Sequence, residues 1–322
     1  MVSLKQLRIL LSVAETGSLS RTSDLLRISQ PAMSRHIRLL ERELRTEIFR
    51  RHGRGMLLTP AGERLVGQIA TPLRELLRTI DDISRPVDTD IGGVVTMGNV
   101  PSTTPVLLPH LITAVSHAYP GITLRMIEGY PGHMIDWVQK GDIDLALVYG
   151  PGSDLHMRVE DVCWEQMVLV AEKEHPLSLD SPVPFSSLAD YPLILPSREH
   201  GVLSVVVRAA NRTGTALTIA HQADSAMMIK GMIQAGLGVS VMALSSVRKE
   251  IAEGQLSAAP ITAPRLMREL VLALPSNRPD RPATEAVIRV FSHLVCQLAD
   301  AGKWDVMPSP AMRRRFEEMP VG

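Results

Sequence analysis

The N-terminal part of the chain places apolar residues at the three- and four-residue spacing of short amphipathic helices. A first helix is expected from Leu4 to near Gly17, where a glycine suits the residue that follows a helix. Ser18 or Ser20 can cap a second helix that runs through Leu26. A tight turn then leads to a third helix, whose apolar stripe is Met33, Ile37, Leu40 and Leu44. This order predicts a helix-turn-helix.

The other face of the third helix is polar and cationic. Ser29 is placed to cap this helix, and Pro31 lies in its first turn, where a missing N–H costs nothing. Its outward side chains are of the kinds that hydrogen-bond base edges or phosphates: Gln30, Ser34, Arg35, Arg38 and Arg42. We interpret this helix as a DNA-recognition helix. The alternative is a solvated, arginine-rich helix face.

Two glycines, Gly53 and Gly55, separate a basic segment from an apolar one directly after these helices. This pattern predicts a β-hairpin, the wing of a winged helix. The basic side chains of the hairpin would face the DNA backbone or a minor groove: Arg50, Arg51 and Arg54.

A longer helix is predicted from Thr59 to Ile83, with an apolar seam like that of a coiled coil. The seam consists of Leu65, Ile69, Leu73, Leu76, Ile80 and Ile83. A seam on a single helix must be buried against something, and we expect a partner subunit rather than a later part of the same chain. Pro72 should kink or divide the helix.

Beyond a Gly/Pro-punctuated hinge at residues 85–93, short apolar strands alternate with helices. A first group has strands at 94–98, 123–128 and 145–149 and helices at 106–117 and 134–140. A second group has strands at 167–171, 193–195, 217–219 and 239–242, helices at 202–211 and 226–234, a returning strand at 270–274 and a closing helix at 284–299. The order of the first group predicts a parallel sheet covered by helices.

Composition narrows the functional classes. The 322 residues carry a formal net charge of zero, but arginine is dense between Arg35 and Arg54, and a local basic patch is what attracts phosphate. No apolar run approaches the roughly 20 residues that span a bilayer, and the N-terminus lacks a signal-peptide pattern.

The two cysteines, Cys163 and Cys296, are far apart in the sequence and do not have the spacing of metal ligands. We expect both to pack in the core, with a redox pair as the alternative. We expect a cytoplasmic protein with no membrane partner, no metal and no cofactor.

Residues 4–63 resemble the winged helix-turn-helix of LysR-type transcriptional regulators. The resemblance rests on Leu7–Glu15, Gly17–Leu19, Gln30–Arg35, Ile37–Leu44, Phe49–Arg51 and Leu58–Gly62. The chain departs from the family pattern at Thr22 and Ser23, where two alanines are usual, and at Arg45, where glycine is usual. If Arg45 adopts a positive φ, it costs about 1 kcal/mol relative to glycine.

The later chain resembles the effector domain of the same family, a two-lobed α/β domain like that of periplasmic binding proteins. The phrases that carry this resemblance are Leu107–Pro109, Tyr119–Gly121, Gly141–Ala146 and Gly236–Val239. Residues 128–133 with Trp137 are nearest to the nitrogen-assimilation-control-like branch.

The predicted fold is therefore α/β with a winged-helix head. The predicted domains are a head at residues 1–58, a linker helix and hinge at 59–90, an effector domain at 91–305 and a mobile tail at 306–322. Lobe I is expected at 91–162 plus 269–305, and lobe II at 163–268.

Ser102, Thr103 and Thr104 lie between the first predicted strand and the helix that begins at Pro105. The carboxyl end of a strand beside a helix N-terminus is a ready anion site, although Thr104 could simply cap the helix. The resemblance adds Pro131, Pro196 and Ser197 around a cleft between two lobes. We expect a small organic anion as the effector.

The resemblance implies a DNA-binding transcriptional regulator that dimerises through the linker helix, forms a tetramer and contacts RNA polymerase. The residues expected at double-stranded DNA are Gln30, Pro31, Ala32, Ser34, Arg35, Arg38, Arg50, Arg51 and Arg54. No nucleophile triad or phosphate-binding glycine loop is recognisable, so we expect no enzyme activity. The alternatives are a ligand-independent DNA binder, and a solute-binding or enzymatic module with a DNA-binding head.

Overall fold

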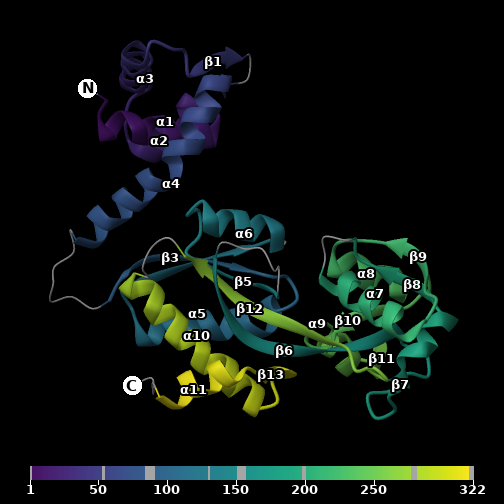
Figure 1. The fold of residues 1–322 in the computed structure, drawn as a ribbon. Helices are drawn as coiled ribbons and strands as arrows, with labels where there is room; N and C mark the ends of the chain where they lie inside the picture. The colour runs from purple at the N-terminus through teal and green to yellow at the C-terminus, as the bar shows by residue number, and fades with distance from the viewer. Residues whose placement is uncertain are drawn as a thin grey trace. The chain divides into compact units, whose positions relative to one another are not determined.

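The computed structural model describes residues 2–52, 55–83, 91–129, 131–150, 157–197, 201–276 and 281–318. The chain forms two compact units, residues 1–87 and 88–322, which we describe separately (Figure 1). Arg54 and most of the predicted hinge lie outside the described residues. In the part of the chain that is described, no helix combines the length and the apolar character that crossing a membrane requires.

The first unit contains the predicted winged helix-turn-helix. It comprises α1 (Leu4–Thr16), α2 (Leu19–Leu26), α3 (Gln30–Leu44), and the antiparallel hairpin of β1 (Phe49–His52) and β2 (Gly55–Leu58). The helices pack around a core that includes Ile9, Leu10, Val13, Met33, Ile37, Leu40 and Ile48. Three of the four stripe residues of α3 are therefore buried, while Leu44 at the end of the helix is exposed.

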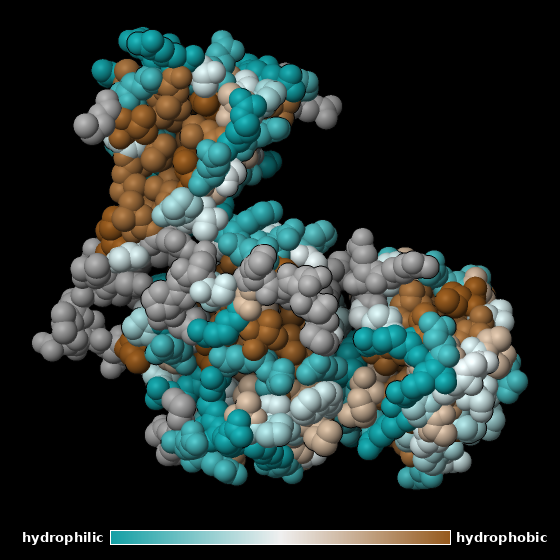
Figure 2. All heavy atoms as spheres, viewed as in Figure 1, coloured by the Kyte–Doolittle hydropathy of each residue, from teal (hydrophilic) through white to brown (hydrophobic). Residues whose placement is uncertain are grey.

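The linker helix α4 (Pro60–Ile83) divides its apolar seam between two environments. Leu65 and Ile69 pack against the core of the head, and Leu73 is also buried. Leu76 and Ile80 continue the seam but expose 49% and 45% of their surface. The helix runs through Pro72 as a single element, so the proline does not divide it into two helices. Figure 2 shows an apolar surface along α1 and α4 of this unit.

The second unit begins with three parallel strands, as predicted. β3 (Gly93–Asn99) lies between β4 (Ile122–Glu128) and β5 (Leu145–Tyr149). The intervening helices are α5 (Thr104–Ala118) and α6 (Pro131–Gln139). The returning strand β12 (Met267–Pro275) is antiparallel to β5, so the sheet as a whole is mixed rather than parallel. We call this layer, with α10 (Pro282–Asp300) packed against it, the first lobe.

The strand β6 (Met157–Glu172) is 16 residues long and contributes side chains to three hydrophobic clusters. Its first part pairs antiparallel with β12, and its second part pairs antiparallel with β10 (Ser240–Ala243) and β11 (Leu256–Thr262). The elements around its second part form the second lobe: β7 (Val183–Pro184), the short helix η1 (Phe185–Asp190), β8 (Pro192–Leu195), α7 (Gly201–Thr213), β9 (Thr218–Gln222), α8 (Ala226–Gln234) and α9 (Leu244–Ala252). β8 and β9 are parallel to each other.

The C-terminal segment corrects one prediction, because residues expected to form a mobile tail are part of the first lobe. β13 (Val306–Pro308) pairs antiparallel with β6, and α11 (Pro310–Glu318) packs on α10. Met312 is buried, and the centre of the Phe316 ring lies 4.8 Å from that of His293. These apolar side chains are widely spaced among charged ones, so they produce no clear helical pattern in the sequence, yet each packs on the first lobe.

Candidate nucleic-acid interface and effector cavity

The recognition helix α3 presents the predicted polar residues on the face opposite its buried stripe. Gln30, Pro31, Arg35 and Arg38 are exposed, while Ala32 and Ser34 are half-buried. Ser29 occupies the N-cap position with extended backbone, but its side chain makes no capping hydrogen bond. The first N–H groups of the helix are therefore not satisfied by their cap, which suits a helix end that faces phosphate oxygens.

The wing is tied to the recognition helix by one carboxylate. Glu41 Oε1 accepts hydrogen bonds from the backbone N–H groups of Ile48 (2.9 Å) and Phe49 (3.1 Å), and so fixes the start of β1 against α3. Arg50 and Arg51 follow on β1, and both are exposed. Three predicted elements of a DNA interface thus belong to one small unit: a polar helix N-terminus, a cationic helix face and a basic strand.

The second unit contains a cavity of about 470 Å³ between its lobes. Ser102 and Thr104 line it at the carboxyl end of β3, Tyr149 at the end of β5, and Arg268 from β12. The second lobe contributes Pro196 after β8 and residues of β10, α8 and α9. Strand ends that meet helix N-termini are the usual ligand position in open α/β sheets.

Of the six residues predicted at the effector site, three line this cavity: Ser102, Thr104 and Pro196. Thr103 is fully buried, and its Oγ1 donates to Asn99 Oδ1 (2.8 Å), so it supports the turn instead. Ser197 does not line the cavity, but its N–H donates to Asp224 Oδ1 (2.7 Å), a residue that does. Pro131 begins α6, and its side chain lies outside the described part of the structure.

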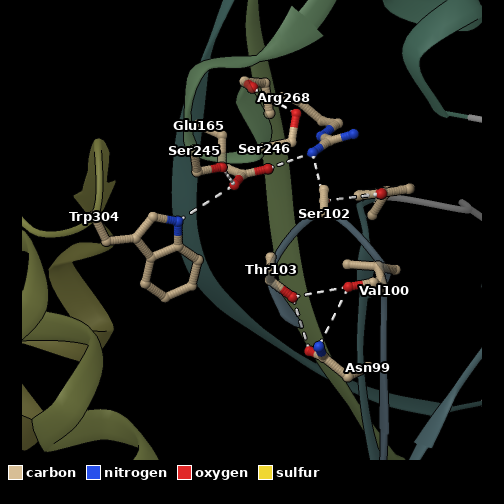
Figure 3. A network of polar contacts seen from close by, with 11 residues as sticks. Asn99, Val100, Ser102, Thr103, Glu165, Ser245, Ser246, Arg268 and Trp304 are labelled. Atoms are coloured by element: carbon tan, nitrogen blue, oxygen red, sulfur yellow. Dashed lines mark hydrogen bonds and ion pairs between the residues drawn. The ribbon is translucent and has the colours of Figure 1, made fainter. Parts of the chain in front are cut away.

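We call the buried ion pair of Arg268 and Glu165, together with Ser102 and Tyr149, the floor of the cavity. Arg268, Ser102 and Tyr149 line the cavity, whereas Glu165 does not. Figure 3 shows the pair and its hydrogen bonds. Arg268 Nη2 lies 2.5 Å from Glu165 Oε2, and both side chains are almost wholly buried, 3% and 1% exposed. The same Nη2 donates to Ser102 Oγ (2.9 Å), which also lies 3.1 Å from the Tyr149 hydroxyl. The guanidinium carbon of Arg268 lies 3.9 Å from the centre of the Tyr149 ring, a cation–π contact.

The electrostatics of this floor follow from burial and pairing. Burial alone would lower the pKa of Arg268, but the neighbouring Tyr149 and Glu165 raise the pKa above its ordinary value. Burial also raises the pKa of the Tyr149 hydroxyl above its ordinary value of 10.0. Arg268 Nε is buried without a hydrogen-bond partner. The floor therefore holds a charged guanidinium with an unused donor.

Sequence reasoning did not identify Arg268, Glu165 or Tyr149 as site residues. The available signal was a charged residue close to an apolar run, Glu165 before 167–171 and Arg268 before 270–274. Such residues are rarely buried unless they are paired. Their pairing depends on β6 and β12 lying side by side, which local pattern does not reveal. In the described residues, no group of three or more metal-ligating side chains is found.

A DNA-binding winged helix followed by a two-lobed domain with a cavity between its lobes defines a class of protein, the ligand-responsive transcriptional regulators. Two family profiles match the chain: the lysR-family bacterial regulatory helix-turn-helix over residues 4–63, and the LysR substrate binding domain over residues 89–294. The chain therefore belongs to the LysR family of transcriptional regulators. It is a DNA-binding regulator with an effector-binding domain, and not an enzyme.

Individual relatives agree with this assignment. A protein of Porphyra purpurea described as "Probable RuBisCO transcriptional regulator" is 30% identical over 298 residues, covering 88% of this chain and 91% of that protein. The "RuBisCO operon transcriptional regulator" of Allochromatium vinosum is 27% identical over 256 residues, covering 78% of this chain and 82% of that protein.

Solved structures share the fold. A variant of full-length OxyR from Pseudomonas aeruginosa matches with a TM-score of 0.72 at 24% identity, covering 90% of this chain and 95% of that one. CbnR, a LysR family transcriptional regulator, matches with a TM-score of 0.67 at 18% identity, covering 91% and 99%. These likenesses show the fold alone.

Proposed function

We propose that this regulator reads a dyad-symmetric DNA site with two or more copies of its head, under control of a small molecule bound in the cavity between its lobes. The observation that carries this proposal is the joint exposure of the polar N-terminal residues of α3 and the arginines of β1 on one small unit. We assign base contacts to Gln30, Pro31, Ala32, Ser34, Arg35 and Arg38, and phosphate contacts to Arg50, Arg51 and Arg54.

Self-association through α4 is part of the proposal. The exposed seam residues Leu76 and Ile80 continue an apolar stripe whose first half is already buried. Covering them with the same helix of a second copy would place two heads on one DNA duplex, because a two-fold interface uses the same patch on both subunits. We also propose that two such dimers form a tetramer, that the protein contacts RNA polymerase and that it is located in the cytoplasm.

The proposed effector is a small molecule that carries an anionic group. Support comes from the N-terminus of α5 beside Ser102 and Thr104, from the N-terminus of α8 in the opposite wall, and from the guanidinium of Arg268, which also lines the cavity. A ligand that contacts both walls would bind one relative arrangement of the lobes better than others. That difference in affinity is what could shift the equilibrium between DNA-bound states.

The test of DNA recognition uses the full chain. Sheared genomic DNA from the source organism is incubated with the purified protein, and the bound fragments are sequenced and footprinted. We expect enrichment of a short sequence with two-fold symmetry, protected at half-sites spaced by whole helical turns. Uniform recovery of fragments, without a shared sequence, would show a non-specific DNA binder and overturn the proposal.

A further inference from the structure

The two cationic side chains of the cavity wall are already paired with carboxylates. Five charged residues line the cavity: Glu128, Asp224, Lys230, Glu250 and Arg268. Among these described residues, both cations have a carboxylate partner. Lys230 Nζ lies 2.5 Å from Glu250 Oε1, and Arg268 Nη2 lies 2.5 Å from Glu165 Oε2. A purely anionic ligand would therefore meet cations whose charge is largely balanced, and its own charge would be poorly compensated.

Glu128 differs from the other acids of the wall. It ends β4, at the edge of the sheet where Ser102 and Thr104 also lie. Its Oε2 accepts one hydrogen bond, from Thr104 Oγ1 (2.8 Å), and Asn99 Nδ2 donates to the same Thr104 hydroxyl (3.0 Å). A hydroxyl orients the carboxylate but does not balance its charge. The wall thus presents an oriented carboxylate in the same cavity as Arg268.

Arg268 and Glu128 both line the cavity and favour ligand groups of opposite charge. Arg268 is more than nine-tenths buried and lines the cavity, so its guanidinium would meet an acceptor oxygen of a ligand there. At Glu128, whose side chain is exposed, a positively charged donor of a ligand would form a charge-assisted hydrogen bond. The rest of the lining is mainly apolar, with side chains such as Pro105, Val202 and Ile229.

We propose that the effector is a zwitterion with an apolar body, its acidic group on the Arg268–Ser102 floor and its protonated amine at Glu128. This inference rests on the proposed function, because it names the chemical class of ligand for the same cavity. A zwitterion keeps the anionic group expected there and adds a cation that balances Glu128. Its net charge of zero avoids burying uncompensated charge in a concave, partly apolar site.

The test uses matched probes that share a body and differ in charge. One set is phenylalanine, phenylpropionate and phenethylamine; the other is leucine, isocaproate and isoamylamine. Binding of each to the full chain is measured by calorimetry and by the shift in Tm. We expect at least one amino acid to bind about tenfold or more tightly than both its acid and its amine. Glu128→Gln should remove the advantage of the amino acid over the acid, while Glu174→Gln, on an exposed turn, should not.

The possible outcomes test the chemical class of the ligand separately from the position of its binding site. If the acids bind as tightly as the amino acids, or if Glu128→Gln leaves the preference intact, the zwitterion is overturned. Loss of the acids' binding in Ser102→Ala would then still place the effector in the cavity. Absence of binding by both amino acids also overturns the zwitterion, whereas the DNA selection described above tests the regulator independently.

Discussion

The indole Nε1–H of Trp304 donates a hydrogen bond to Glu165 Oε1 over 3.3 Å, and so joins the C-terminal segment to the floor of the effector cavity (Figure 3). Ser245 Oγ, at the start of α9, donates to the same oxygen over 2.8 Å. Glu165 Oε2 pairs with Arg268. One buried carboxylate thus holds groups from both lobes and from a segment that follows the matched effector-domain profile at residue 294. The C-terminal segment therefore contacts the carboxylate that pairs with Arg268.

Glu165→Ala should be strongly destabilising, because it leaves Arg268 buried without a counter-charge. The expected loss is about 3–5 kcal/mol in the free energy of unfolding of the second unit. Trp304→Phe removes one hydrogen bond to a charged acceptor and should cost about 1–3 kcal/mol. Urea unfolding followed by circular dichroism measures both. Trp164→Phe is the matched control, and an equal loss in the two tryptophan variants would contradict the role given to the Trp304 indole.

Arg35→Ala should weaken operator binding by about 1–3 kcal/mol and relax the preference for one base pair. Arg35 is exposed near the N-terminus of α3, where recognition-helix side chains reach deepest. Arg50→Ala, on the wing, should instead weaken all sequences alike and lower the salt slope by about one. Gel-shift titrations at several salt concentrations distinguish the two effects. Arg212→Ala, exposed on α7, serves as the control and should bind as the wild type does.

Leu76→Asp or Ile80→Asp should shift the protein toward monomers. Both side chains are roughly half exposed in the isolated chain, and a buried carboxylate at a subunit interface is costly. Arg64→Asp introduces the same side chain on an exposed, differently directed face of α4 and should leave association unchanged. Sedimentation velocity over a concentration series measures the result. If neither seam variant changes the sedimentation coefficient, α4 is not the dimer contact.

Local patterns predicted the first unit well, because its elements are short and defined by neighbouring residues. The stripe Met33, Ile37 and Leu40 correctly located α3, and the two glycines at 53 and 55 correctly located the hairpin. Thr22 replaces a usual alanine without loss of packing, because its buried hydroxyl donates to Ser18 O (2.8 Å). Such compensation is visible only in three dimensions.

Long-range pairing is what sequence patterns could not supply. The strand at 167–171 was predicted, but β6 begins ten residues earlier, at Met157, because its first residues, several of them exposed, pair with β12. The same cause hid the Glu165–Arg268 pair, whose members lie more than a hundred residues apart in the sequence. Trp304 likewise gives no local signal of the carboxylate that it contacts.

Arg45→Gly should stabilise the first unit. Arg45 ends α3 with φ of 52°, the left-handed conformation that the sequence analysis considered for this position. A side chain there costs about 1 kcal/mol relative to glycine, although glycine also gains freedom in the unfolded chain. We therefore expect a gain of about 0.5 kcal/mol or more in thermal unfolding. Glu43→Gly, inside the same helix, should be destabilising by about 1 kcal/mol. A loss of stability in Arg45→Gly would show that its side chain makes contacts that outweigh the strain.

Acid should loosen α11 before it unfolds the lobe beneath. Arg313 donates two hydrogen bonds to Asp300, over 2.7 and 2.6 Å, and these lower the pKa of Asp300 below its ordinary value of 3.8. A carboxylate with a lowered pKa in the folded state contributes stability that is complete above 3.8 and is lost as the pH falls through the lower, folded value. Amide hydrogen exchange of residues 310–318 should therefore be slower in the wild type than in Asp300→Asn at about pH 7, and the difference should vanish at about pH 2. The ion pair is solvent-exposed, so high salt should also reduce the difference. Equal exchange of the two proteins at neutral pH would mean that the apolar contacts of Met312 and Phe316 hold the helix without help from this pair.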